Sequence, residues 1–81
     1  MATGDQLKEL LRDADLCSSR GDYDQSFSHL LKVLRHFQVD PRLRMSEKPL
    51  LSKLLKALDH LQRGGCYCPV QSAARRAREL L

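Results

Sequence analysis

The sequence has no tryptophan and only four other aromatic residues, two tyrosines and two phenylalanines. Stacking of bases on exposed aromatic rings is a main source of affinity for single-stranded nucleic acids. Phe27 and Phe37 fall on the apolar stripe of a predicted helix, so few rings remain for stacking. This scarcity argues against a nucleic-acid-binding module built on stacking. It does not exclude binding through contacts to phosphates.

Cysteines are also few. There are three of them, an odd number that does not fit a disulfide framework and indicates a reducing compartment. No apolar run approaches the roughly 20 residues that cross a bilayer. The opening residues, Met1–Asp5, contain neither the basic nor the apolar stretch of a secretory signal. We therefore expect an intracellular protein with no membrane segment.

Runs of alternating β-branched residues are absent as well, which argues against strands. Apolar residues make up 42% of the chain and charged residues 30%, as in a globular domain and unlike a disordered tail. At 81 residues the chain is expected to form one domain, 1–81. Its net charge of +4 is modest and favours acidic partners, either acidic peptides or nucleic acid.

Apolar residues recur at helical spacing through almost the whole chain. The first predicted helix runs roughly from Gln6 to Ser19, and Gly21 suits the left-handed residue that ends many helices. Asp22 and Gln25 have capping-box spacing at the start of the second helix. Asp40-Pro41 ends that helix, because the residue before a proline is disfavoured in the α region. The expected inner face of the second helix carries Tyr23, Phe27, Leu30, Leu31, Leu34 and Phe37.

A short helical turn is predicted from Pro41 to Met45, after which Pro49 fits the first turn of a fourth helix. Gly64-Gly65 ends the fourth helix, and Pro69 opens the last one. The sequence thus predicts an all-α fold, a compact bundle of four helices plus a short connecting helix. The other expected inner faces are Leu7, Leu10, Leu11, Ala14 and Cys17 in the first helix, Leu50, Leu51, Leu54, Leu55, Leu58 and Leu61 in the fourth, and Val70, Ala73, Ala74, Ala77, Leu80 and Leu81 in the last.

No catalytic or metal centre is predicted. Cys66-Tyr67-Cys68 follows His60, but structural zinc takes four ligands in pairs spaced by about two to four residues. Here one residue separates the cysteines and no fourth ligand is evident. The histidines lack a nucleophile with an orienting partner, and the nearby hydroxyls of Ser26 and Ser28 are expected on a helix surface. We expect no enzymatic activity and no cofactor.

Two alternatives concern binding and scaffolding. Arg75, Arg76 and Arg78, with Arg63, form a basic cluster that would contact phosphates in a nucleic-acid-binding module, although a solvated helix face has the same composition. Separately, Arg20–Gln25 followed by Asp40-Pro41 is similar to the turn and closing proline of a tetratricopeptide repeat, and a three-helix trafficking module is similar over the same stretch. No second copy is present, whereas solenoids need several repeats. A helical scaffold domain that pairs with a partner subunit would have this pattern.

A broader resemblance covers about Leu7 to Leu81. Leu51–His60, LSKLLKALDH, is similar in its apolar positions and at Lys53 to the fourth-helix motif of the N-terminal domain of transcription elongation factor S-II. Ala77–Leu81, ARELL, resembles the Ala-Lys-x-Leu-Leu of that family's last helix. Elongin A, a Mediator subunit and the integrase-binding domain of lens epithelium-derived growth factor share this domain. From Gly21 to about Gln62 the integrase-binding type aligns without gaps. The family fold is a compact five-helix bundle.

The resemblance implies a docking function. Family members capture short disordered segments that combine acidic residues with one or two aromatic or aliphatic anchors. It implies a nuclear, monomeric domain that recruits partners in transcription elongation or chromatin regulation. Because the chain stops on Leu80-Leu81 in mid-pattern, we expect a fragment of a longer protein.

The binding notch of the integrase-binding type lies where the first inter-helix loop meets the loop after the fourth helix. Arg20 and Arg63 occupy positions that are aliphatic in that relative. We therefore expect electrostatic, salt-sensitive binding of the partner around Leu61. The implied partner-binding residues are Arg20, Gly21, Asp22, Lys56, His60, Leu61 and Arg63.

Overall fold

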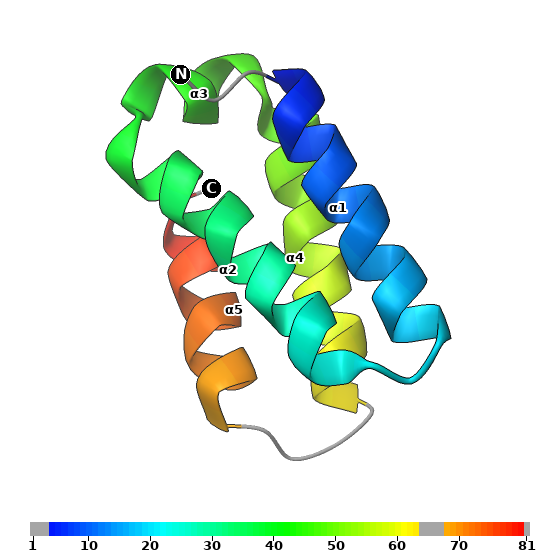
Figure 1. The fold of residues 1–81 in the computed structure, drawn as a ribbon. Helices are drawn as coiled ribbons and strands as arrows, with labels where there is room; N and C mark the ends of the chain where they lie inside the picture. Colours follow the sequence, from blue (N-terminus) through cyan, green and yellow to red (C-terminus); the bar gives the residue numbers. More distant parts are fainter. Residues whose placement is uncertain (1–3, 64–67, 81) are drawn as a thin grey trace.

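The computed structural model describes residues 4–63 and 68–80, which fold into helices with no strand (Figure 1). The predicted all-α bundle of four helices and one short connecting helix is confirmed over these residues. Several residues with sequence-based predictions, namely Gly64-Gly65, Cys66-Tyr67 and Leu81, lie outside the described ranges. The helices are α1 (Gly4–Ser19), α2 (Tyr23–Val39), α3 (Pro41–Ser46), α4 (Lys48–Arg63) and α5 (Cys68–Leu80).

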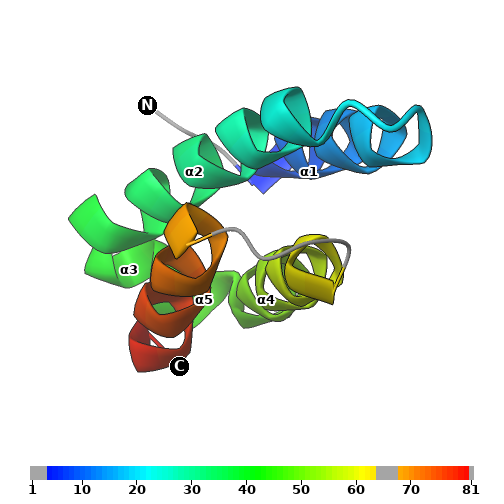
Figure 2. The same ribbon diagram turned by 90° about the horizontal axis from the view of Figure 1, so that it is seen from below.

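The four long helices form two layers. α1 and α2 make an antiparallel hairpin, and α4 and α5 make a second antiparallel pair that packs against it, while α3 connects the layers at one end (Figures 1 and 2). α2 contacts every other helix, whereas α1 packs closely against α2 and less closely against α4. The looser contact between α1 and α4 is where the candidate site described below lies.

The turn between α1 and α2 follows the prediction for Gly21, which has a φ of 83°. The N–H of Gly21 donates to the carbonyl of Ser18 at 3.1 Å, and the N–H of Asp22 donates to the carbonyl of Cys17 at 2.8 Å. These two bonds are those of a Schellman motif, which satisfies carbonyls left free at the end of a helix. A positive φ is easily adopted by glycine because it has no Cβ.

The predicted capping box at the start of α2 is wrong. Asp22 precedes α2, but its side chain makes no capping hydrogen bond. With φ and ψ at −89° and 72°, its backbone lies outside the β region in which capping residues usually present their side chains. Asp40 instead caps the short α3, since its Oδ1 accepts from the N–H of Arg42 at 3.0 Å. Pro41 then occupies the first turn of α3, as its missing N–H allows.

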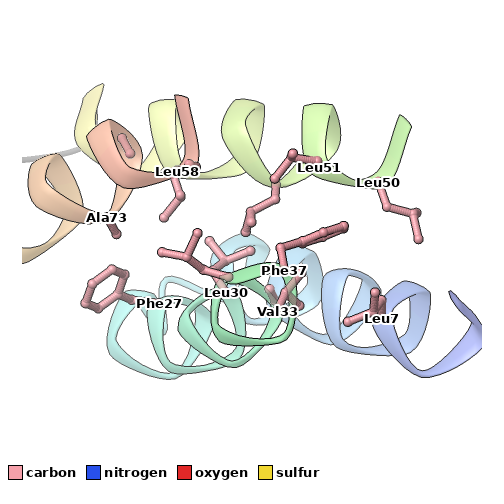
Figure 3. Close-up of a cluster of buried hydrophobic side chains, with 14 of the residues drawn as sticks. Leu7, Phe27, Leu30, Val33, Phe37, Leu50, Leu51, Leu58 and Ala73 are labelled. Carbon is pink, nitrogen blue, oxygen red and sulfur yellow. The ribbon is translucent and has the colours of Figure 1, made fainter. Parts of the chain in front are cut away.

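The core lies between the two layers, where leucines of α4 point toward apolar side chains of α2 (Figure 3). Leu51, Leu58 and Phe37 are completely buried, and Ala73 and Ala77 of α5 let that helix approach closely. Most of the predicted inner faces are therefore correct. Some of their members pack at the edge of the core and are partly buried, namely Leu10, Leu11, Leu55 and Leu80.

Two predictions for the inner face of α2 are wrong. Tyr23 and Leu31 were expected inside, but they are 51% and 41% exposed. Tyr23 is the first residue of α2, and Leu31 lies on the flank of the helix that faces away from the core. Val33 is completely buried instead, because it continues the stripe formed by Leu30 and Phe37.

Ser26 was expected on the helix surface, but it is the buried polar residue of the described core. Its Oγ donates a hydrogen bond to the carbonyl of Ala14 at 2.7 Å. This bond joins α2 to α1 across the hairpin. A small polar side chain is stable there because its hydroxyl has a partner.

Candidate functional site

A groove with a volume of about 570 Å³ lies between α1 and α4, which run side by side in the same direction (Figure 1). We call it the basic groove. Its depth follows from the loose contact between these two helices. Its lining comes from Lys8, Leu11, Arg12, Ala14, Asp15 and Ser18 of α1, Ser26 of α2, and Leu50, Lys53, Lys56, Ala57 and His60 of α4.

The floor of the basic groove is buried and mostly apolar. Ala14, Ser26 and Leu50 are its buried lining residues, and the hydroxyl of Ser26 donates its hydrogen to the carbonyl of Ala14. Leu11 and Ala57 are partly buried and form the walls, one on each helix. A ligand in the groove would therefore cover apolar carbon, which favours burial of an apolar anchor.

The rim of the basic groove is exposed and cationic. Lys8 and Arg12 stand one helical turn apart on α1, and Lys53 and Lys56 stand one turn apart on α4. Within the described residues these four side chains make no ion pair. Asp15 is the acidic residue of the lining. The rim thus carries an excess of positive charge on both sides of an apolar floor.

Two of the residues implied by the family resemblance line the basic groove. Lys56 and His60 lie on the α4 side, at adjacent turns of that helix. The structure brings them opposite Asp15 and Ser18 of α1, which the sequence reasoning did not single out.

The other five implied residues lie elsewhere at the same end of the molecule. Arg20, Gly21 and Asp22 form the exposed turn between α1 and α2, and Arg63 is the exposed last residue of α4 (Figure 1). Leu61 is 7% exposed and belongs to the core. None of these five lines the basic groove.

Three basic residues of the rim, Lys8, Arg12 and Lys53, were not predicted from the sequence as parts of a binding surface. Lys8 and Arg12 flank Leu11 at helical spacing, and that pattern was visible in the sequence. Periodicity predicts which residues share a face of one helix, but it does not predict which helix lies beside that face.

Three of the four arginines of the predicted cluster lie on α5, the fourth, Arg63, ends α4, and none of them lines the basic groove. Arg75, Arg76 and Arg78 are all exposed. The guanidinium of Arg78 lies 3.4 Å from Oδ1 of Asp59 and links α5 to α4. Within the described ranges, Arg75 and Arg76 make no ion pair. These two arginines are a second, smaller basic surface.

The described residues contain no group of three or more histidine, cysteine or acidic side chains that would hold a metal ion. Cys17 and Cys68 are free thiols, and the remaining cysteine of the predicted motif, Cys66, lies outside the described ranges. None of the described helices is long and apolar enough to span a bilayer. Comparisons with protein-family models, with curated proteins and with solved structures found no match to this chain.

Proposed function

We propose that this chain is a non-catalytic interaction domain that docks short linear motifs of disordered partner proteins. Each motif would combine acidic residues with aromatic or aliphatic anchors. The observation that carries the proposal is the basic groove, in which an apolar floor lies between two rows of cations without ion pairs. This arrangement is complementary to such a motif in both shape and charge.

The two parts of the groove would contribute differently to binding. Burial of an anchor against Leu11 and Ala57 would supply affinity, at about 25 cal/mol per Å² of apolar surface removed from water. The exposed cations would steer an acidic segment toward the groove and raise the association rate. Because Lys53 and Lys56 are exposed, we expect their contribution to weaken as salt is added.

The five-helix bundle agrees with the architecture expected for the S-II N-terminal-domain family. We therefore propose that the chain is a monomeric member of that family, acts in the nucleus, and recruits partners in transcription elongation or chromatin regulation. In this proposal the notch at Arg20, Gly21, Asp22, Leu61 and Arg63 continues into the basic groove. Lys56 and His60 join the two, because they line the end of the groove nearest Arg63.

Binding of nucleic acid is the second candidate. Arg75 and Arg76 are exposed on α5 and make no ion pair with the described residues, so they are free to contact phosphates. Two arginines and a net charge of +4 supply few such contacts. We therefore rank this function below peptide docking.

Paired charge reversals distinguish the two functions. Lys53→Glu with Lys56→Glu alters the basic groove, and Arg75→Glu with Arg76→Glu is the matched control, since it also reverses two exposed cations. Binding of a fluorescent acidic peptide with a phenylalanine anchor, and of a short RNA duplex, is measured by anisotropy for both variants. The proposal expects the groove variant to lose about tenfold or more in peptide affinity, since close charge pairs across an interface contribute about 1.5 kcal/mol or more. Peptide binding that depends only on Arg75 and Arg76, or binding of RNA alone, would contradict it.

A further inference from the structure

We infer that the basic groove accepts its partner as an acidic amphipathic α-helix of about three turns, lying along α1 and α4. This inference rests on the proposed docking function and specifies the conformation of the docked segment. It follows from three properties of the groove: the hydrogen-bonding state of its walls, its length and the positions of its cations.

The backbone of the walls offers an extended peptide no hydrogen-bond partners. Both walls are α-helices, so their backbone groups are already bonded within α1 and α4. The hydroxyl of Ser26 is buried and donates its hydrogen to the carbonyl of Ala14. A strand lying against this apolar floor would bury unpaired N–H and C=O groups at a high cost in free energy. A helix satisfies its own backbone and needs only side-chain contacts.

The length of the groove sets the length of the helix. On α1 the lining extends from Lys8 to Ser18, and on α4 from Leu50 to His60. Ten residues of helix span about 15 Å at a rise of about 1.5 Å per residue, which is close to three turns. A docked helix would therefore place apolar residues at positions i, i+3 or i+4, and i+7 on the floor.

The cations lie on both sides of that floor. Lys8 and Arg12 form one edge, and Lys53 and Lys56 form the other, each pair spaced by one turn. A docked helix would place acidic residues on both flanks of its apolar stripe, where they face these two edges. The partner that fits is therefore an amphipathic helix with a negative charge on each flank, supplied by another protein.

A second copy of this chain is the competing occupant. α1 carries exposed Asp5, Glu9 and Asp13 on its outer side, together with Leu16, which is 52% exposed. This face of α1 is itself an acidic helix. If it filled the groove of another molecule, the protein would associate with itself, and Glu9→Lys would weaken that association.

Two designed peptides of about 14 residues test the conformation. The first has leucines at i, i+4 and i+7 with glutamates on both flanks, and the second differs only by a proline in place of the central glutamate. A proline in a helix interior is strongly unfavourable, so the inference expects the second peptide to bind about a hundredfold more weakly. Circular dichroism of the first peptide with the protein should show added helicity.

The outcomes separate this inference from the proposed function. If the affinity of the proline peptide is within about threefold of that of the first peptide, the helical conformation is wrong and docking stands. If neither peptide binds, both the inference and the proposed function fail. If sedimentation equilibrium shows a dimer that Glu9→Lys dissociates, the groove belongs to a second copy and the inference is overturned.

The position of the helix is tested with variants of the groove. Ala57→Leu adds bulk to a partly buried wall and should reduce binding of the first peptide more than tenfold. Lys53→Glu changes an exposed residue of the same groove, and it tests the position of the docked helix if Ala57→Leu disturbs the fold. Ser72→Leu, on the exposed face of α5, is the matched control. If all three variants bind the first peptide as tightly as the unsubstituted protein does, the peptide lies elsewhere and the inference is overturned.

Discussion

Ser26 of α2 donates a buried hydrogen bond of 2.7 Å to the carbonyl of Ala14 of α1. Both residues are buried in the lining of the basic groove, so this bond joins the two helices of the hairpin and also holds part of the lining in place. The pair is small, which allows α1 and α2 to approach closely, and the hydroxyl adds direction to that contact. Stability and the shape of the site therefore depend on the same two residues.

Replacement of Ser26 by alanine should destabilise the protein by about 1 kcal/mol, because a buried hydrogen bond is lost while little volume changes. Ser28, two residues further along α2, is exposed and gives the control Ser28→Ala, which should change stability by less than about 0.5 kcal/mol. Urea unfolding followed by circular dichroism measures both. Equal stability of the two variants would mean that the bond to Ala14 contributes little.

The turn at Gly21 gives a prediction about backbone conformation. No neighbouring atom lies within 4 Å of the position of an added Cβ, so alanine would cause no clash there. The φ of 83° is nevertheless unfavourable for alanine, and Gly21→Ala should cost about 1 kcal/mol of stability. Gly21→Asn should cost less, since asparagine tolerates the left-handed region better than alanine. Thermal unfolding of the two variants compares them, and an alanine variant as stable as the wild type would contradict the described turn.

Core packing predicts a large effect at Leu58. Its side chain is completely buried between the layers, so Leu58→Ala should cost about 2–5 kcal/mol. Leu16→Ala removes the same number of atoms from a side chain that is 52% exposed, and its effect should be much smaller. Urea unfolding measures both changes. Similar losses at the two positions would contradict the assignment of the core.

The ion pair between Arg78 and Asp59 should contribute little to stability. The two side chains are 63% and 42% exposed, and pairs of this kind contribute about 0–1 kcal/mol in water. Arg78→Ala should therefore lower the free energy of unfolding by less than about 1 kcal/mol, and added salt should reduce even that difference. A loss of several kcal/mol would show that Arg78 packs more tightly than its exposure indicates.

Salt distinguishes peptide docking from binding of nucleic acid. The affinity of an anchored peptide should fall as salt is added and then level off, because the part of the affinity that comes from apolar burial is not screened. Binding to RNA through Arg75 and Arg76 should decline linearly with the logarithm of salt, because each phosphate contact releases counterions. Anisotropy titrations over a range of salt concentrations measure both. A peptide affinity that vanishes at high salt would contradict an apolar contribution from the groove.

The helices and most of their buried faces could be predicted from the sequence because apolar periodicity and prolines report on local structure. Pro41, Pro49 and Pro69 each lie in the first turn of a helix, as predicted. Side-chain details at the helix ends were less predictable. Asp22 has the residue type and spacing of a cap, but the backbone of the turn does not bring its carboxylate to the free N–H groups.

The basic groove could not be predicted because it depends on how two helices lie relative to each other. Lys8 and Lys53 are far apart in the sequence, and they line one groove only because α1 and α4 run side by side. Ser26 shows the same limit, since its burial depends on the position of Ala14 in another helix. Lys56 and His60 were singled out through the family resemblance, and the structure places them on this groove.

The most direct test of peptide docking in the basic groove is an NMR titration of the isotope-labelled protein with the glutamate-flanked leucine peptide. Docking in the basic groove predicts that amide shifts concentrate on residues 8–18 of α1 and 50–60 of α4, which are its two walls. Shifts confined to α5 around Arg75 and Arg76, or a response to an RNA duplex with none to the peptide, would contradict peptide docking and favour a nucleic-acid-binding module.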